Sequence, residues 1–151
     1  MKPLYILILL STLSLPLLPQ ELDYSDLLAI YNFRTNLEWV DSFLANKNFS
    51  FQEYKDNSYV FSLNRNSKNM AAAFCMVNKD FIGLQSHDRQ TFTYFKDIAN
   101  SRKMKLTDSG ATDDGAMFFD YKSSSAFLKL VQIMNTAGNG STSYMIFFRL
   151  L

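Results

Sequence analysis

The chain has 151 residues, of which 15 are basic and 14 are acidic, so its net charge is only +1 at pH 7. A nearly neutral chain lacks the broad basic surface that binds nucleic acids, and we therefore expect no nucleic-acid partner. Because Cys75 is the single cysteine, an intramolecular disulfide, a zinc ribbon and a CxxC redox site are also excluded.

The first 20 residues have the pattern of an export signal. A basic start and a seven-residue apolar run are followed by Pro16 and Pro19, which interrupt the run before it reaches the about 20 apolar residues of a spanning helix. We predict a signal peptide over residues 1–20, with cleavage after Ser14 or Gln20, and an uncleaved anchor is the alternative. The protein is then exported, periplasmic or secreted, with no stable membrane anchor after cleavage.

Two helices are expected at the start of the exported part, which we predict to be a single domain over residues 21–151. The first is a short helix near 25–33, and the second spans about 36–46. Apolar residues in the second recur every three or four positions, which is the spacing of an amphipathic helix. Thr35 and Glu38 have the spacing of a capping box at its start.

From residue 49 onward the apolar period changes to two, which is typical of strands. Turn-forming residues separate the apolar runs, and a third helix, which Ser86 or Asp88 can cap, divides them into two groups of four. The expected strands are 49–54, 58–65, 70–78 and 81–85 before this helix, and 104–109, 116–122, 126–134 and 143–150 after it.

This order predicts an α+β fold of two tandem α-β-β-β-β repeats, with antiparallel sheet or sheets and the helices packed on one face. Repeat 1 spans about 24–86 and repeat 2 about 87–151. Few positions are identical between them, so a chance similarity of two helix-plus-hairpin units stays open, as does whether two sheets join or stack. The runs 126–134 and 143–150 are apolar on both faces, which favours central strands or a face that meets a partner.

Two groups of residues suggest chemistry, but each has a simpler structural interpretation. Cys75 and His87 could form a nucleophile and its base, although a cysteine inside an apolar strand usually behaves as a small buried hydrophobe. Asp108, Asp113 and Asp114 lack the spacing of a calcium loop, and an Asp-Gly turn accounts for them. We therefore predict no enzyme activity, no catalytic residue, no metal and no cofactor.

The order of elements behind a leader resembles that of small exported proteins built from tandem helix-plus-four-strand repeats. It is similar in architecture to the secreted β-lactamase inhibitor protein family, in which two such units form one curved antiparallel sheet whose concave face grips an enzyme. The resemblance implies this fold and an inhibitor-like function. The two disulfides typical of that family are impossible with one cysteine, and no inhibitor motif matches residue by residue.

We therefore expect a non-enzymatic exported module that presents one sheet face to a possible protein partner. One alternative is a small-ligand or glycan-binding protein with a pocket between the two repeats. A more remote alternative is a cysteine hydrolase built on Cys75 and His87. The candidate binding residues, placed on the sheet face that we expect to be free, are Val60, Phe118, Lys122 and Lys129.

Overall fold

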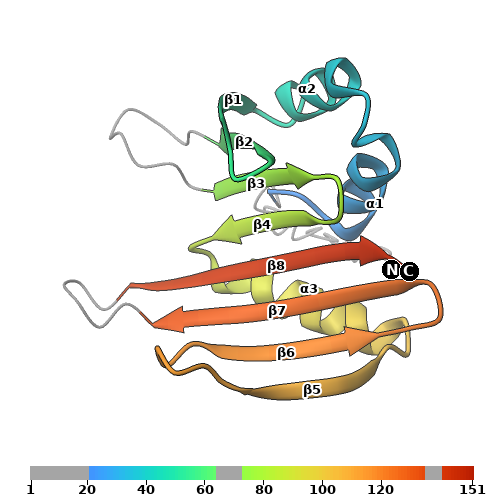
Figure 1. The fold of residues 1–151 in the computed structure, drawn as a ribbon. Coiled ribbons are helices and arrows are strands. Elements are labelled where there is room, and N and C mark those ends of the chain that lie inside the picture. The colour runs from blue at the N-terminus through green and yellow to red at the C-terminus, as the bar shows by residue number, and fades with distance from the viewer. Residues whose placement is uncertain (1–20, 64–72, 135–140) are drawn as a thin grey trace, which may run out of the picture.

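The structure is a computed structural model that describes residues 21–63, 73–134 and 141–151, so the predicted signal peptide lies outside the described residues. None of the helices within these ranges is long and apolar enough to cross a membrane. The described elements, labelled in Figure 1, are α1 (Tyr24–Phe33), α2 (Leu37–Ala45), β1 (Phe49–Lys55), β2 (Ser58–Leu63), β3 (Ala73–Asn78), β4 (Ile82–Ser86), α3 (Arg89–Ser101), β5 (Lys105–Ala111), β6 (Met117–Lys122), β7 (Ala126–Met134) and β8 (Thr142–Leu150).

The described strands form one antiparallel sheet in the order β1-β2-β3-β4-β8-β7-β6-β5 (Figure 1). Each half is a meander, and the halves join where β4 pairs with β8, with Leu84 opposite Ile146. The two predicted units therefore extend a single sheet edge to edge and do not stack. The α+β class is as predicted, and β7 and β8 take the central positions that their two-sided apolar pattern favoured.

The two outer strands carry a bulge at a corresponding point. The register with the neighbouring strand shifts between Phe51 and Glu53 in β1, and between Leu106 and Asp108 in β5. A bulge interrupts the ladder and bends the strand, which makes an exposed edge a poorer template for another strand. The tandem repeats themselves, and their origin by duplication, stay a prediction.

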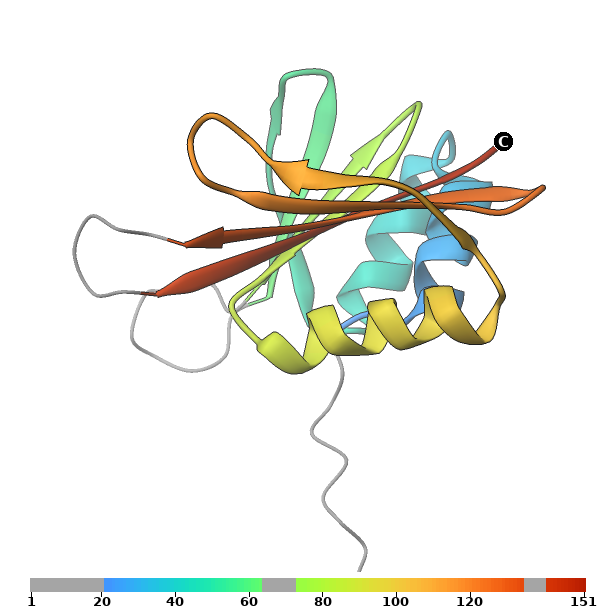
Figure 2. The same cartoon turned by 90° about the horizontal axis from the view of Figure 1, so that it is seen from below.

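The core lies between one face of the sheet and the helices, which are all on the same side (Figure 2). Helix α1 packs on β4 and β8, α3 packs on β7 and β8, and α2 packs on β1. The rings of Tyr24 and Tyr31 on α1 meet Phe148 edge to face, with centroids 5.2 and 5.9 Å apart. Side chains with no exposed surface in this layer include Leu27, Ile30, Val40, Leu44, Leu84, Phe95, Leu128, Leu130 and Ile146.

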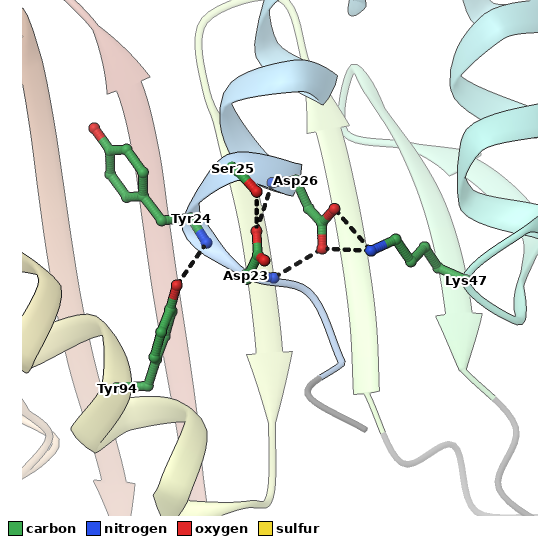
Figure 3. A network of polar contacts seen from close by, with 6 residues as sticks. All are labelled: Asp23, Tyr24, Ser25, Asp26, Lys47 and Tyr94. Carbon is green, nitrogen blue, oxygen red and sulfur yellow. Dashed lines mark hydrogen bonds and ion pairs between the residues drawn. The ribbon is translucent and has the colours of Figure 1, made fainter. Parts of the chain in front are cut away.

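A polar network at the start of α1 connects the three helices (Figure 3). Asp23 Oδ1 accepts from the Asp26 N–H at 2.8 Å, and Asp26 Oδ2 accepts from the Asp23 N–H at 3.0 Å, which is a capping box. Asp26 also lies 2.9 Å from Lys47 Nζ, just beyond α2, and the Tyr24 N–H donates to Tyr94 Oη on α3 at 3.3 Å. These contacts orient α1 on the sheet.

The capping box predicted at Thr35 and Glu38 is wrong. Asn36 is the N-cap of α2, and its Oδ1 accepts from the Trp39 N–H at 3.1 Å. Asparagine and threonine are both favoured N-caps, so the one that caps depends on where the chain leaves α1. Asp88, one of the two predicted alternatives, caps α3.

Candidate functional site

The sheet face opposite the helices, called here the bare face, is left uncovered by every helix within the described ranges (Figures 1 and 2). Alternation along β7 divides its apolar side chains between the two faces. Leu128 and Leu130 are fully buried beneath the helices, whereas Phe127 and Val131 are half-buried on the bare face. The strand therefore presents apolar surface to solvent as well as to the core.

A row of directly opposed residues crosses the bare face. Val60 lies opposite Met76, Met76 opposite Gly83, Gly83 opposite Phe147, and Phe147 opposite Lys129. Opposed residues of antiparallel strands point to the same side of the sheet. A Cβ added at Gly83 would lie 2.8 Å from Met76 Cε, so the methionine covers the glycine closely. The middle of the bare face is thus apolar and well packed.

All four predicted binding residues lie on the bare face, and three of them lie together. Phe118 and Lys122 are on β6, and Lys129 is on the adjoining β7, with its Nζ 4.8 Å from the Phe118 ring centroid and 3.5 Å from Asp120 Oδ1. Val60 is on β2, five strand spacings from β6, which is about 24 Å. The role of these residues in binding stays a prediction.

A hollow of about 200 Å³ opens on the bare face where the two halves of the sheet meet. The rings of Phe81 and Phe147 meet edge to face at 5.6 Å, and Arg149 Cζ lies 5.2 Å from the centroid of Phe127. No local sequence pattern indicates this hollow, because it forms only when β4 and β8 pair. Its lining residues are Asp80, Phe81, Phe127, Phe147, Phe148 and Arg149.

Positive charge predominates on the bare face of β6, β7 and β8. Their outward positions carry three cations, Lys122, Lys129 and Arg149, and one carboxylate, Asp120, which is paired with Lys129. An uneven charge of this kind attracts a surface of opposite sign and disfavours a basic one. These three strands thus combine an apolar centre with more cations than carboxylates, while Asp80 lines the hollow and Asp108 lies opposite Asp120 on β5.

The structure does not bring Cys75 and His87 together. Cys75 lies on the helix-covered side of β3 with no exposed surface, and burial raises the pKa of its thiol to about 12. A thiol in such a site stays protonated and is a poor nucleophile. His87 is exposed, and its Nδ1 lies 3.2 Å from the Oγ of Ser143 on β8. The hydrolase alternative therefore gains no support from this geometry.

Two of the three acidic residues singled out as a possible calcium loop lie in a turn, and the third, Asp108, is on β5. Asp113 and Asp114 lie between β5 and β6, where Gly115 has a φ of +82°. The Thr112 hydroxyl donates to Asp114 and holds the pKa of that carboxyl below its usual range. Within the part of the chain that the structure describes, no group of three or more histidine, cysteine, aspartate or glutamate residues could hold a metal ion.

No family model, curated protein or solved structure matches the chain. The resemblance to the β-lactamase inhibitor protein family and the export of the chain therefore stay predictions.

Proposed function

We propose that the protein is a non-enzymatic, exported binding module that holds a partner protein on the bare face of its sheet. The observation that carries this proposal is that β7 and β8 are apolar on both faces, while the helices cover only one. Single exposed apolar residues are ordinary, but a contiguous apolar band across adjoining strands is typical of an interaction surface.

The dimensions of the bare face suit such an interface. Eight strands spaced at about 4.8 Å, each about six residues long, give a face of roughly 34 by 20 Å, or roughly 700 Å². One partner in a stable complex of standard size contributes about 600–1,000 Å², and the estimate lies within this range. The face is therefore large enough for a specific partner without help from the rest of the molecule.

The chemistry of the face defines the partner. The hollow lined by Phe81, Phe127 and Phe147 has room for a single apolar or aromatic side chain, which is the kind of residue that dominates binding energy at interfaces. Carboxylates beside that side chain would lie near Lys122 and Arg149. The proposed partner is thus a protein that presents an apolar anchor flanked by acidic residues.

The test is a pull-down from the native envelope and medium, with matched variants on and off the bare face. Phe118→Asp and Lys122→Glu change the bare face, whereas Phe51→Asp on β1 and Lys96→Glu on α3 make the same changes on the other side of the sheet. Phe51 is 49% exposed, so its replacement is no more disruptive than that of Phe118. Thermal unfolding of each variant confirms that it is folded before binding is compared.

We expect one specific acidic partner that is lost with Phe118→Asp and weakened by Lys122→Glu, and retained by both controls. Retention that ignores the bare-face substitutions, or the absence of any retained protein, would overturn the proposal. Sedimentation of the purified protein tests whether a second copy of the chain, instead of a separate partner, covers the bare face. A dimer that dissociates on Phe118→Asp would show that a second copy covers the face, and would exclude a separate partner there.

A further inference from the structure

A second hollow, of about 460 Å³, lies on the helix-covered side at one end of the first half of the sheet. Three connections border it: the one from α1 to α2, the turn from β1 to β2, and the turn from β3 to β4. It is separate from the bare face, because Tyr59 and Val77 in its wall belong to the covered side. Its lining residues are Arg34, Thr35, Leu37, Tyr54, Asn57, Tyr59, Val77, Asn78 and Lys79.

Arg34 is held in place at this hollow. Its Nε donates to the carbonyl oxygen of Lys79 at 2.6 Å, and its Nη1 donates to the carbonyl oxygen of Tyr31. Its Cζ lies 3.9 Å from the centroid of the Tyr31 ring. These contacts use two of its N–H groups and fix the plane of the guanidinium. Because the Arg34 side chain is already ordered, binding of a ligand to its remaining N–H groups costs little side-chain entropy.

The polar groups around Arg34 are neutral or positive. Lys79 supplies a second cation, and the nine lining residues include no carboxylate. The amide of Asn78 is buried and already engaged, because its Nδ2 donates to the carbonyl oxygen of Asn57 at 2.8 Å and to Ser58 Oγ at 3.2 Å, and its Oδ1 accepts from the Asp80 N–H at 3.0 Å. The lining of the hollow therefore combines two positive charges with neutral side chains and contributes no negative charge of its own, which favours an anionic ligand.

An aromatic platform forms one wall of the hollow. The rings of Tyr54 and Tyr59 lie 4.8 Å apart, and Tyr54 is 57% exposed. Asp56 and Asn57 have positive φ angles, as a two-residue hairpin turn requires, so their conformation needs no ligand to explain it. That turn does not require an exposed tyrosine, however, and a flat ring of this kind can pack against the apolar face of a sugar.

We infer that this hollow binds a carbohydrate that carries a carboxylate. The sugar ring packs on Tyr54, its hydroxyls meet the side-chain amide of Asn57, and its carboxylate meets Arg34 and Lys79. A guanidinium and a carboxylate make strong paired hydrogen bonds, and the volume lies within the about 300–1,000 Å³ of ligand pockets. The inference goes beyond the proposed partner surface, because the two sites lie on opposite sides of the sheet.

The test is calorimetric titration of the protein, purified after expression of the full chain, with trigalacturonate, neutral galactotriose and sodium sulfate. We expect saturable binding of trigalacturonate, and binding of galactotriose that is about tenfold weaker because the charge-assisted hydrogen bonds are lost. Sulfate that binds as tightly as trigalacturonate would show a simple anion site and overturn the sugar assignment. Absence of trigalacturonate binding at millimolar concentration would overturn the inference as a whole.

Variants then locate the site. Lys79→Gln removes a charge but leaves the backbone carbonyl that holds Arg34, and Tyr54→Ala removes the exposed ring. Each should weaken trigalacturonate binding by about tenfold, whereas Tyr54→Phe, which keeps the ring, should retain it. Lys105→Gln and Leu106→Ala make matched changes on the opposite edge strand and should have no effect.

Equal affinity for Lys79→Gln and the unchanged protein would show that trigalacturonate binds elsewhere and would contradict the assignment. Phe118→Asp, on the bare face, should leave trigalacturonate affinity unchanged. This last variant separates the two sites, because failure of the partner-binding proposal would not alter the titration.

Discussion

The two faces of strand β8 both carry large apolar side chains, but their surroundings differ. Ile146 and Phe148 point to the helices and have no exposed surface, and the Tyr24 ring closes over Phe148 from α1. Met145 and Phe147 point to the bare face and are half-buried. The ring nearest to Phe147 in the described contacts is that of Phe81, another residue on the bare face.

This difference shows that apolar alternation alone does not decide which face of a sheet becomes the core. The helices decide it, because they remove one face from water. An apolar side chain on the covered face contributes its full transfer free energy to folding, whereas a half-buried one contributes only part of it and leaves apolar surface in solvent. Apolar side chains on the bare face thus contribute less to folding than those on the covered face, and the proposed function assigns them to a partner.

The largest expected contrast between the faces is in thiol reactivity. Cys75 in the folded protein should react with a maleimide on the order of a thousandfold more slowly than a cysteine introduced by Lys122→Cys in a Cys75→Ala background. Burial raises the pKa of the Cys75 thiol to about 12, so little thiolate exists until the protein opens. Stopped-flow or mass-spectrometric labelling measures both rates.

In denaturant the two cysteines should react at the same rate, which serves as the control. Rapid labelling of Cys75 under native conditions would contradict the assignment of β3 to a closed core.

Stability should show the next largest contrast. Phe148→Ala is expected to lower the free energy of unfolding by about 3–5 kcal/mol, because it empties a fully buried site beneath α1. Phe147→Ala, one residue away on the bare face, should cost only about 1–2 kcal/mol. Urea unfolding of the two variants measures the difference. Equal losses would mean that the bare face contributes to folding as a core does, and would weaken the case for a partner.

Much of the fold could be predicted because its signals are local. Within the described residues each of the eight expected strands coincides with a strand of the structure, and β7 and β8 are interior, which is one of the two outcomes that the two-sided pattern of 126–134 and 143–150 favours. The pairing of β4 with β8 cannot be predicted in this way. Every free strand edge offers the same backbone N–H and C=O groups, so the local sequence does not indicate which two edges will pair. The aromatic hollow depends on that pairing, so no local pattern could reveal it.

The candidate site was predictable in part for the same reason. Phe118 and Lys122 share a side of one strand by alternation, and Lys129 joins them because β6 and β7 form a hairpin. Val60 lies on the same face but far from these three residues, because the strand order places β2 in the other half of the sheet. Arg34 was missed altogether, since its position against the carbonyl oxygen of Lys79 depends on two turns that are distant in sequence.

The smallest expected effect concerns how firmly α1 covers its face of the sheet. Partial burial alone would raise the pKa of the Asp23 carboxyl, but hydrogen bonds from Ser25 and from the Asp26 N–H, together with the charge of Lys47, outweigh burial and lower that pKa below its ordinary 3.8. The carboxylate is therefore favoured in the folded state. Its contribution to stability is present above the unfolded-state pKa, near pH 4, and is lost as the pH falls through the lower folded-state pKa.

Two substitutions separate the charge of Asp23 from its hydrogen bonding. Asp23→Asn keeps an N-cap oxygen but cannot ionise, so the fall in the free energy of unfolding below pH 4 should be shallower than in the unchanged protein. Asp23→Ala removes the cap as well and should cost about 1 kcal/mol at neutral pH. Urea unfolding between pH 2 and 7 measures both effects. If Asp23→Asn leaves the acid profile unchanged, other carboxylates account for the acid sensitivity. The charge of Asp23 then does not help to hold α1 on the covered face, and apolar contacts such as that of Tyr24 with Phe148 hold it there.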